Sequence, residues 1–249
     1  MLFRSIFWDV DGTLAETELE GHRLAFNAAF AEASLPWQWD RGTYRRWLAV
    51  PGGRERIAGY LASLEARTPS EELLDQLVAA KQRHYANLLR QGTIQLRDGV
   101  ARLISTAAAA GVRQVIVTTS SRAAVNALLA GALQPHGQAF EACICGDDVL
   151  RKKPHPEGYS KALMQTGVDP AHVVALEDSK AGLAAATGAS LTTVLTRSEV
   201  SVDDSLEAFG AAAAVLDGLG EPHKPARLLR GPACPEGMVS LSWLESLLP

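Results

Sequence analysis

Short apolar runs alternate with helix-like segments along the second half of this chain. Strand-like runs lie at residues 113–119, 142–145, 172–176 and 191–195, and each gap between them carries a helical pattern. Two parallel strands need a crossover connection, which is usually a helix, so this alternation predicts an α/β fold. We expect a parallel sheet with helices on both faces.

The tail of the chain has a weaker pattern. The apolar run at residues 211–216 predicts a last strand at the edge of the sheet. Residues 218–237 are rich in Gly and Pro and are expected to form a loop, and residues 241–248 a short helix. We see no internal repeat.

A further apolar run, residues 5–8, leads directly into Asp9, Asp11 and Gly12. The chain bends where a strand ends, and Gly12 permits such a turn, so both acids can face one spot. Ligands bind at this edge of α/β sheets, and two carboxylates there repel each other unless a cation relieves them. Mg²⁺ is the candidate because it prefers hard oxygen ligands. The alternatives are a solvated surface turn and a calcium loop, although an EF-hand would need a further acid and a terminal Glu.

The segment before Gly92 has a nearly all-helical pattern. We expect helices around residues 24–33, 40–48, 54–66 and 70–89, with Ser70 as the N-cap of the last. The segment Pro51-Gly52-Gly53-Arg54 interrupts them, and Arg54 can bind a phosphate bidentately. A plain turn between helices is the alternative for this segment.

Composition limits the partners. The 249 residues are 47% hydrophobic, and the net charge of −4 with scattered Lys and Arg argues against a nucleic-acid surface. No apolar run reaches the roughly 18 residues of a membrane span, and no signal-peptide pattern precedes Asp9, so we expect a cytoplasmic protein without a membrane partner. Cys143, Cys145 and Cys234 have neither a disulfide framework nor zinc-site spacing.

The segment Asp9-Val10-Asp11-Gly12-Thr13-Leu14 resembles motif I of the haloacid dehalogenase-like (HAD) hydrolases, most of which are phosphatases with an aspartate nucleophile. The core of that family is a Rossmann-like sheet, which agrees with the pattern above. A helical insert between motifs I and II is the arrangement of members with a C1 cap. The resemblance therefore implies a HAD core formed by residues 1–16 and 93–249, with an all-helical C1 cap at residues 17–92.

The other HAD motifs follow in order. Thr118, at the end of a strand, is similar to motif II, whose hydroxyl holds the transferring phosphoryl group. The following Thr119 and Ser120 are expected to contact the substrate; the alternative for Ser120 and Ser121 is to cap the next helix. Lys153 before Pro154 resembles the motif III lysine, whereas Lys152 is expected to be solvated.

Glu177 and Asp178 end an apolar strand and resemble motif IV. The resemblance implies that Asp178 is a direct Mg²⁺ ligand and that Glu177 is a ligand or orients a metal-bound water. Asp9 and the backbone carbonyl of Asp11 complete the expected metal site. An N-cap role for Asp178 or Ser179 on the next helix is the alternative, and both roles are compatible.

The implied reaction has two steps. Asp9 attacks phosphorus and forms an aspartyl-phosphate, and Asp11 protonates the leaving oxygen and later takes a proton from water. Mg²⁺, Lys153 and Thr118 are expected to stabilise the transferring group. Asp11 argues against dehalogenase chemistry, which needs no acid. A phosphonatase would need a cap lysine for an imine, and Lys81 lies in an ordinary helical run.

The chain contains the segments Ala15-Glu16-Thr17-Glu18, Gly52-Gly53-Arg54-Glu55-Arg56 and Ala175-Leu176-Glu177-Asp178-Ser179. Through these and neighbouring segments, up to about Arg197, it resembles the CbbY-type phosphatases, which dephosphorylate xylulose 1,5-bisphosphate, an inhibitory by-product of rubisco. Positions carried over for binding the sugar and its far phosphate are Glu18, His22, Tyr44, Gly53 and Arg54. Two departures are Arg54, where Lys is usual, and an extra residue at Gly21 that displaces His22. Packing on the inner face of the cap is the alternative for His22 and Tyr44.

We therefore expect a Mg²⁺-dependent phosphatase of a small phosphosugar, with xylulose 1,5-bisphosphate favoured, that acts as a monomer. One alternative is a β-phosphoglucomutase-like phosphomutase, which returns the phosphoryl group to a sugar. The other is a non-catalytic phosphosugar-binding protein, although a pure binder has no need of both Asp9 and Asp11.

Overall fold

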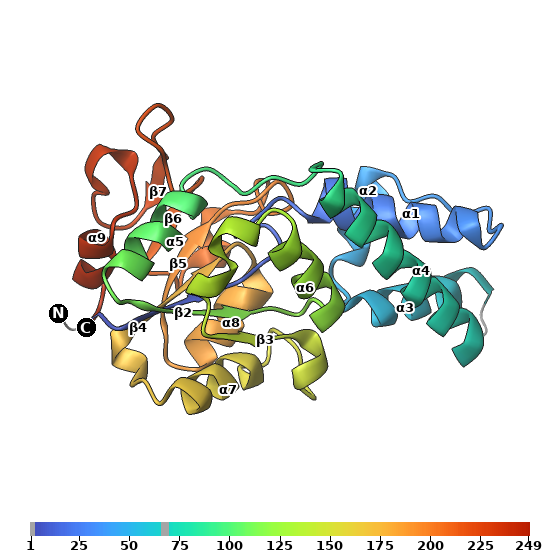
Figure 1. The fold of residues 1–249 in the computed structure, drawn as a ribbon, viewed down its shortest axis with the longest axis horizontal. Helices are drawn as coiled ribbons and strands as arrows, with labels where there is room; N and C mark the ends of the chain where they lie inside the picture. The colour runs from blue at the N-terminus through green and yellow to red at the C-terminus, as the bar shows by residue number, and fades with distance from the viewer. Residues whose placement is uncertain (1–2, 66–69) are drawn as a thin grey trace.

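A seven-stranded sheet forms the centre of the protein, described by a computed structural model for residues 3–65 and 70–249 (Figure 1). In spatial order the strands are β3 (Ala142–Ile144), β2 (Arg113–Val117), β1 (Ser5–Trp8), β4 (Val173–Glu177), β5 (Thr192–Thr196), β6 (Ala214–Leu216) and β7 (Leu228–Arg230). Neighbours from β3 to β6 pair in parallel. The carboxyl ends of β1, β2 and β4 therefore meet at the same edge.

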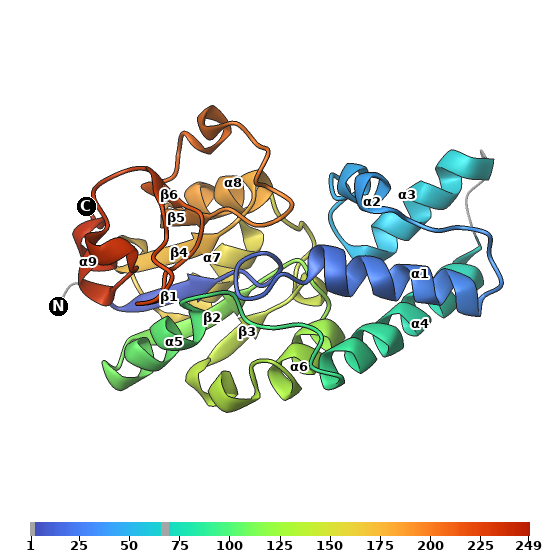
Figure 2. The same ribbon diagram turned by 90° about the horizontal axis from the view of Figure 1, so that it is seen from above.

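Helices cover both faces of the sheet (Figures 1 and 2). These helices are α5 (Val100–Ala109), α6 (Arg122–Ala130), α7 (Glu157–Thr166), α8 (Lys180–Gly188) and α9 (Leu241–Ser246). Successive side chains of a strand face opposite sides: Ile6 and Trp8 pack in the cluster with α5, α6 and α9, whereas Phe7 packs in the cluster with α7 and α8. The sheet is buried on both faces, as the continuous apolar runs predict.

Among the described residues, the four α-helices α1 to α4 lie beyond one end of the sheet and form what we call the helical insert (Figure 2). They are α1 (Arg23–Glu32), α2 (Arg41–Trp47), α3 (Gly53–Glu65) and α4 (Glu71–Arg90). The Asp40 side chain caps α2 by accepting from Thr43 N at 2.6 Å, and Ser70 caps α4 as expected. Aromatic residues, including Phe26, Phe30, Trp39 and Tyr44, give the insert its own apolar cluster.

The predicted fold class, an α/β sheet with helices on both faces and an inserted helical segment, is confirmed. The predicted helix at residues 54–66 corresponds to α3, and Ala66 lies outside the described residues. The division at residues 16/17 and 92/93 stays a prediction.

The tail differs from the expectation at one strand. The run at residues 211–216 does form a strand, β6, but it is not the edge, because β7 pairs with it in antiparallel fashion from within the predicted loop. The three residues of β7 are too few to give a pattern, and the pairing comes from the open edge of β6 instead. Arg230 fixes this edge by donating to the carbonyls of Phe209 and Gly210.

Within the described residues, no helix is both long and apolar enough to cross a bilayer. Cys143, Cys145 and Cys234 are free thiols in this structure. Burial raises the pKa of Cys145 to about 12, so this thiol is poorly reactive at neutral pH.

Candidate active site

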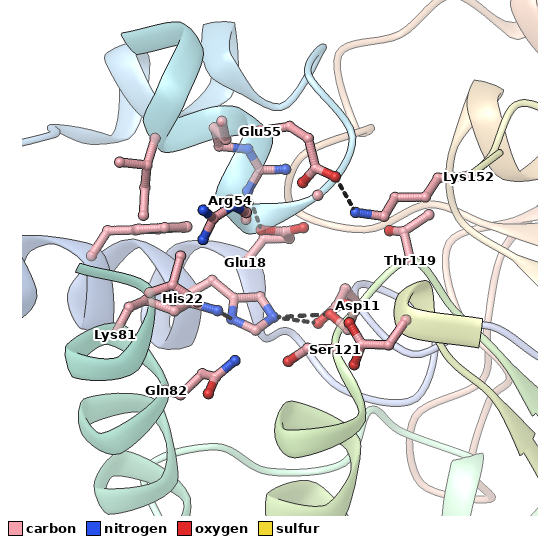
Figure 3. Close-up of a pocket in the computed structure, with 18 residues that line it drawn as sticks. Asp11, Glu18, His22, Arg54, Glu55, Lys81, Gln82, Thr119, Ser121 and Lys152 are labelled. Atoms are coloured by element: carbon pink, nitrogen blue, oxygen red, sulfur yellow. Dashed lines mark hydrogen bonds and ion pairs between the residues drawn. The ribbon is translucent and has the colours of Figure 1, made fainter. Parts of the chain in front are cut away.

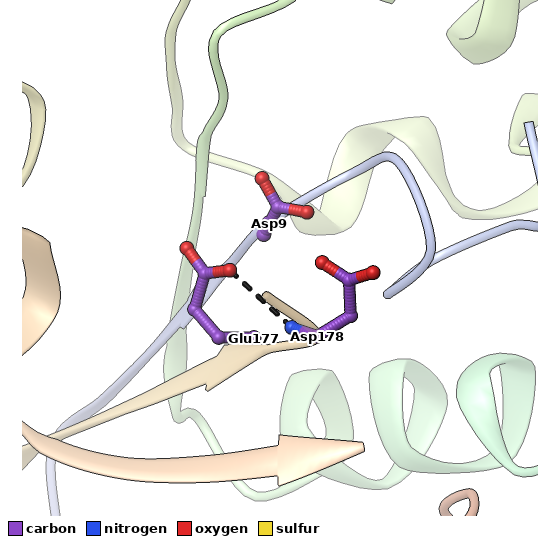
Figure 4. A group of neighbouring side chains, drawn as sticks. All are labelled: Asp9, Glu177 and Asp178. Carbon is purple, nitrogen blue, oxygen red and sulfur yellow. Dashed lines mark hydrogen bonds between the residues drawn. The ribbon is translucent and has the colours of Figure 1, made fainter. Parts of the chain in front are cut away.

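Three buried carboxylates meet where β1 and β4 end (Figure 4). Asp9 follows β1, Glu177 is the last residue of β4, and Asp178 is the next residue. The register pairs Trp8 with Leu176, so the next residues, Asp9 and Glu177, lie side by side, and Asp178 follows directly. One oxygen of each lies within 4.8 Å of the others, so the group can hold a metal ion.

Lys153 supplies the positive charge beside this cluster. Its ammonium donates to Asp9 Oδ1 and to Glu177 Oε1, both at 2.6 Å, and to the carbonyl of Val117 at 2.8 Å. Burial raises the pKa of Asp9, Lys153 opposes this, and Glu177 raises it further. Burial, with Asp9 and Glu177 nearby, also raises the pKa of Asp178. Three acids around one ammonium leave negative charge in excess, and an all-oxygen donor set fits a hard divalent cation.

Tyr159 of α7 fixes Glu177 from behind. Its hydroxyl donates to Glu177 Oε1 at 2.5 Å, and the ammonium of Lys153 lies 5.1 Å from the centre of its ring. Both Tyr159 and Glu177 are fully buried. The role of Tyr159 is not predictable from the sequence, because its partner Glu177 is on a different element.

The carboxylate of Asp11 is not part of the acidic cluster and faces the helical insert. Its Oδ1 accepts from the hydroxyl of Thr17 and lies 2.9 Å from His22 Nε2, and its Oδ2 accepts from Ser120 Oγ at 2.5 Å. Burial alone would raise the pKa of Asp11, but His22, Ser120 and Thr17 together hold it below its ordinary value. Any metal contact by Asp11 is therefore left to its backbone carbonyl, as expected from the motif.

Lys81 continues this network (Figure 3). Its ammonium lies 2.9 Å from His22 Nδ1, and burial lowers the pKa of Lys81 to about 8. Lys81 was expected to lie in an ordinary helical run, whereas in the structure it contacts the residue that binds Asp11. A signal was present: Lys81 interrupts the apolar stripe of α4 that includes Leu77 and Tyr85.

A π-helical turn accommodates the extra residue that precedes His22. Glu18–His22 form a π-helical turn of five residues, and such a turn accommodates one more residue than an α-helical turn. Gly21 fits because a Cβ there would lie 2.7 Å from Ile94 Cδ1. His22 consequently still reaches Asp11.

Two adjoining cavities open over these residues. The inner cavity, of about 130 Å³, is lined by Asp9, Lys153 and Asp178, and the outer cavity, of about 270 Å³, is lined mainly by the helical insert (Figure 3). Shared lining residues are Asp11, Glu18, Arg56 and Thr119. A small molecule in the outer cavity can therefore present one end to Asp9.

Thr118 and Thr119 have different surroundings. Thr118 is buried, its hydroxyl accepts from Ser120 N at 3.0 Å, and it lines neither cavity. Thr119 lines both cavities, and Ser120 lines the outer one. The role of the Thr118 hydroxyl in holding the phosphoryl group stays a prediction.

Tyr44 supports the site from behind. It is fully buried and lines neither cavity, and its hydroxyl donates to Glu18 and accepts from Arg56 Nη1 at 2.9 Å. Burial raises the pKa of Tyr44 well above its ordinary value. Arg56, which sequence analysis did not select, lies between the two cavities with its guanidinium 3.8 Å from Glu18 Oε2. The segment Pro51-Gly52-Gly53-Arg54 predicted a phosphate-binding arginine at Arg54 but gave no signal for Arg56.

The basic residues that line the outer cavity are His22, Arg54, Arg56, Lys81 and Lys152. Gly53 and Arg54 line it, and Arg54 pairs with Glu71 and with Asp75 at 2.5 Å. Lys152 was expected to be solvated, but it lines the cavity and pairs with Glu55 of α3. The same lining contains Asp11, Glu18, Glu55 and Asp147, so a bound anion would replace the present carboxylate partners of Arg54 and Lys152.

Comparisons with known proteins agree with this geometry. The profile of the haloacid dehalogenase-like hydrolases matches residues 3–190. Protein CbbY of Rhodobacter capsulatus is 44% identical over 209 residues, which are 84% of this chain and 91% of that protein. The crystal structure of CbbY from Rhodobacter sphaeroides in complex with phosphate has a TM-score of 0.80 and 39% identity, covering 87% of this chain and 94% of that chain. A mutant of the latter protein, in complex with xylulose-(1,5)bisphosphate, gives a TM-score of 0.81 at 38% identity, covering 88% and 96%.

Proposed function

The chain belongs to the haloacid dehalogenase-like hydrolases, in their CbbY-type branch, and is a phosphatase; we propose that it hydrolyses a small sugar bisphosphate, xylulose 1,5-bisphosphate, with Mg²⁺. The observation that carries this proposal is the pair of adjoining cavities. Asp9 lines the inner one, and Arg54, Lys81 and Lys152 line the outer one. One phosphate would meet the nucleophile while the other is held by cations some distance away. The xylulose-(1,5)bisphosphate complex of the similar CbbY protein supports this choice.

In the first step a carboxylate oxygen of Asp9 forms a bond to phosphorus, and the bond from phosphorus to the sugar oxygen breaks. Asp11 enters this step protonated, because the anionic phosphate nearby raises the pKa that hydrogen bonds hold low in the free protein, and it gives the proton to the departing oxygen. In the second step water attacks phosphorus of the aspartyl-phosphate, Asp11 takes its proton, and inorganic phosphate and free Asp9 are released. Lys153 offsets the negative charge of Asp9, and the hydroxyl of Thr118 holds the transferring group, with Thr119 beside it at the inner cavity.

Mg²⁺ would be held by Asp9 and Asp178, with the Asp11 carbonyl and with Glu177 as a ligand or as the residue orienting a bound water. When bound, it supplies the positive charge that phosphoryl transfer requires. The fit rests on the carboxylate cluster, whose oxygens lie within 4.8 Å of one another.

We propose that residues 17–92 act as the C1 cap, which excludes water from the first step. Glu18, His22, Gly53, Arg54 and Ser120 would contact the substrate, and Tyr44 would hold Glu18 and Arg56 in place. We also propose that the enzyme acts as a monomer in the cytoplasm, a reducing compartment that suits its free cysteines.

The test is phosphate release with Mg²⁺ from xylulose 1,5-bisphosphate, ribulose 1,5-bisphosphate, β-glucose 1-phosphate and phosphoglycolate. A strong preference for the xylulose bisphosphate supports the proposal. Activity confined to monophosphates, or spread evenly, contradicts the bisphosphate assignment. Conversion of β-glucose 1-phosphate into an isomer without phosphate release would instead identify a phosphomutase. Asp9→Asn is the control for all substrates, because turnover should vanish.

A further inference from the structure

Arg97 lies where the chain returns from the helical insert to the sheet. Its backbone N–H donates to the carbonyl of Leu14 at 3.0 Å, and Leu96 forms a β-bridge with Ala15. The two connections between sheet and insert therefore run side by side at this point. Arg97 belongs to none of the sequence motifs described above.

The guanidinium of Arg97 is almost fully enclosed, with 10% of the side chain exposed. Nη1 donates to the Gly12 carbonyl and, at 3.1–3.2 Å, to both oxygens of Thr196. Nη2 donates to the carbonyls of Arg197 and Asp217 at 2.6 and 3.2 Å. Nε lies 3.1 Å from Glu16 Oε1, which is the carboxylate partner of this cation. A buried guanidinium needs such a complete set of acceptors, and the planar group holds them in a fixed arrangement.

Among the groups that accept from Arg97, the carbonyl of Gly12 is the one next to Asp11 in the chain. Its φ of +87° suits glycine, and a Cβ at this position would lie 2.2 Å from Asp178 Oδ2 and 2.8 Å from Ser198 Cβ. Its loop is tight, because the Val10 carbonyl accepts from the N–H groups of Thr13 and Leu14 at 3.2 and 3.0 Å. Asp178 thus limits this loop on one side, and Arg97 holds it through the Gly12 carbonyl.

We propose that Arg97 is a positioning residue that fixes the backbone next to Asp11, so that the Asp11 carboxylate stands where it gives and takes a proton. Thr17, His22 and Ser120 bind the carboxylate itself, whereas Arg97 determines where the peptide that follows Asp11 lies. The inference rests on the proposed role of Asp11 as acid and base. It assigns Arg97 an effect on proton transfer rather than on stability alone.

Arg102 provides a matched control. It is another partly buried arginine that donates to backbone carbonyls, those of Leu219, Gly220 and Val239, at 2.7–3.0 Å. It joins α5 to the C-terminal segment and lines neither cavity of the site. Arg97→Met and Arg102→Met therefore remove similar bonds, but only the first contacts the Asp11 loop.

The experiment compares kcat/KM for two substrates in Arg97→Met, Arg97→Lys and Arg102→Met. The substrates are the best sugar phosphate of the panel, whose leaving oxygen needs a proton, and 4-nitrophenyl phosphate, whose leaving phenolate does not. For Arg97→Met we expect a loss of about 100-fold on the sugar phosphate and of at most about threefold on 4-nitrophenyl phosphate. Arg97→Lys should lie between Arg97→Met and wild type, because it keeps a donor without the planar group. Equal losses on both substrates, or the same pattern in Arg102→Met, would overturn the proposal.

Hydrogen exchange of the metal-free proteins gives an answer that does not depend on turnover. We expect faster exchange in the peptide spanning residues 9–17 for Arg97→Met, and wild-type exchange there for Arg102→Met. Unchanged exchange in Arg97→Met would also overturn the proposal. Wild-type protein without activity on any phosphate ester would refute the proposed function alone, and exchange would then decide whether Arg97 holds the loop. Arg97→Lys serves the same comparison where Arg97→Met does not fold.

Discussion

The ammonium of Lys81 lies 2.9 Å from the Nδ1 atom of His22. A protonated lysine has donors only, so Nδ1 is the acceptor, and the proton of a neutral imidazole is then on Nε2. That nitrogen lies 2.9 Å from Asp11 Oδ1, to which it donates. Lys81 thereby selects the tautomer of His22 that binds Asp11, across the boundary between the insert and the sheet.

Lys81→Met should lower kcat/KM about tenfold or more on sugar phosphates, in line with the loss of a group that orients another ligand-binding side chain. The reason is that His22 loses the bond that fixes its tautomer. Gln82→Met is the matched control, since Gln82 is the next residue and lines the same cavity without a described bond to His22. Equal activity of the two variants would contradict the assignment. Steady-state kinetics of both variants is the measurement.

Lys81 should also give the stability a recognisable pH dependence. Its pKa falls from 10.5 to about 8 on folding, so between these values the unfolded chain binds more protons than the folded protein. The free energy of unfolding therefore rises with pH across this window. Below about pH 8 Lys81 is charged in both states, and burial of its charge lowers the free energy of unfolding by the full amount. The difference in unfolding free energy between wild type and Lys81→Met should change by at most about 3 kcal/mol from pH 7 to pH 11. Urea unfolding at several pH values measures it, and a difference independent of pH would refute the expectation.

Asp178→Asn should have opposite effects on stability with and without Mg²⁺. Without metal, it removes one of three buried carboxylates and raises the melting temperature. Folding raises the pKa of Asp178, so ionising this carboxyl destabilises folded wild type. The variant is therefore no more stable than wild type below the unfolded pKa, and its advantage in stability grows as pH rises toward the folded pKa. With Mg²⁺ at about 100 times its Kd, wild type should gain about 2.7 kcal/mol, whereas the variant gains little. Thermal unfolding checks this prediction, with the exposed Asp203→Asn as control.

Arg54→Ala should raise KM for the bisphosphate about tenfold or more and leave monophosphates nearly unaffected, because a charge-assisted bond to the far phosphate is lost. Arg83→Ala is the control: Arg83 is also an exposed arginine of the insert paired with an acid, Glu32, and it does not line the cavity. Kinetics on both substrate classes decides the matter. An equal rise in KM for monophosphates and bisphosphates would mean that Arg54 does not bind the second phosphate.

Much of the fold could be predicted because its signals are local. The apolar runs before Asp9 and Glu177 are strands β1 and β4, and the helical pattern before Gly92 is the insert. β7 could not be predicted, because its pairing depends on the free edge of β6 rather than on its own residues.

The candidate site divides in the same way. The sequence determined which acids follow which strands, since a strand's end and the residues after it are adjacent along the chain, and the parallel sheet then gathers Asp9 and Asp178 at one edge. Only the tertiary structure decided that Lys81 reaches His22 and that Arg97 holds Gly12, because these partners are 59 and 85 residues apart. The identity of a lysine or arginine sets its charge, whereas its partner depends on how separate elements pack, which residue spacing along one element does not encode.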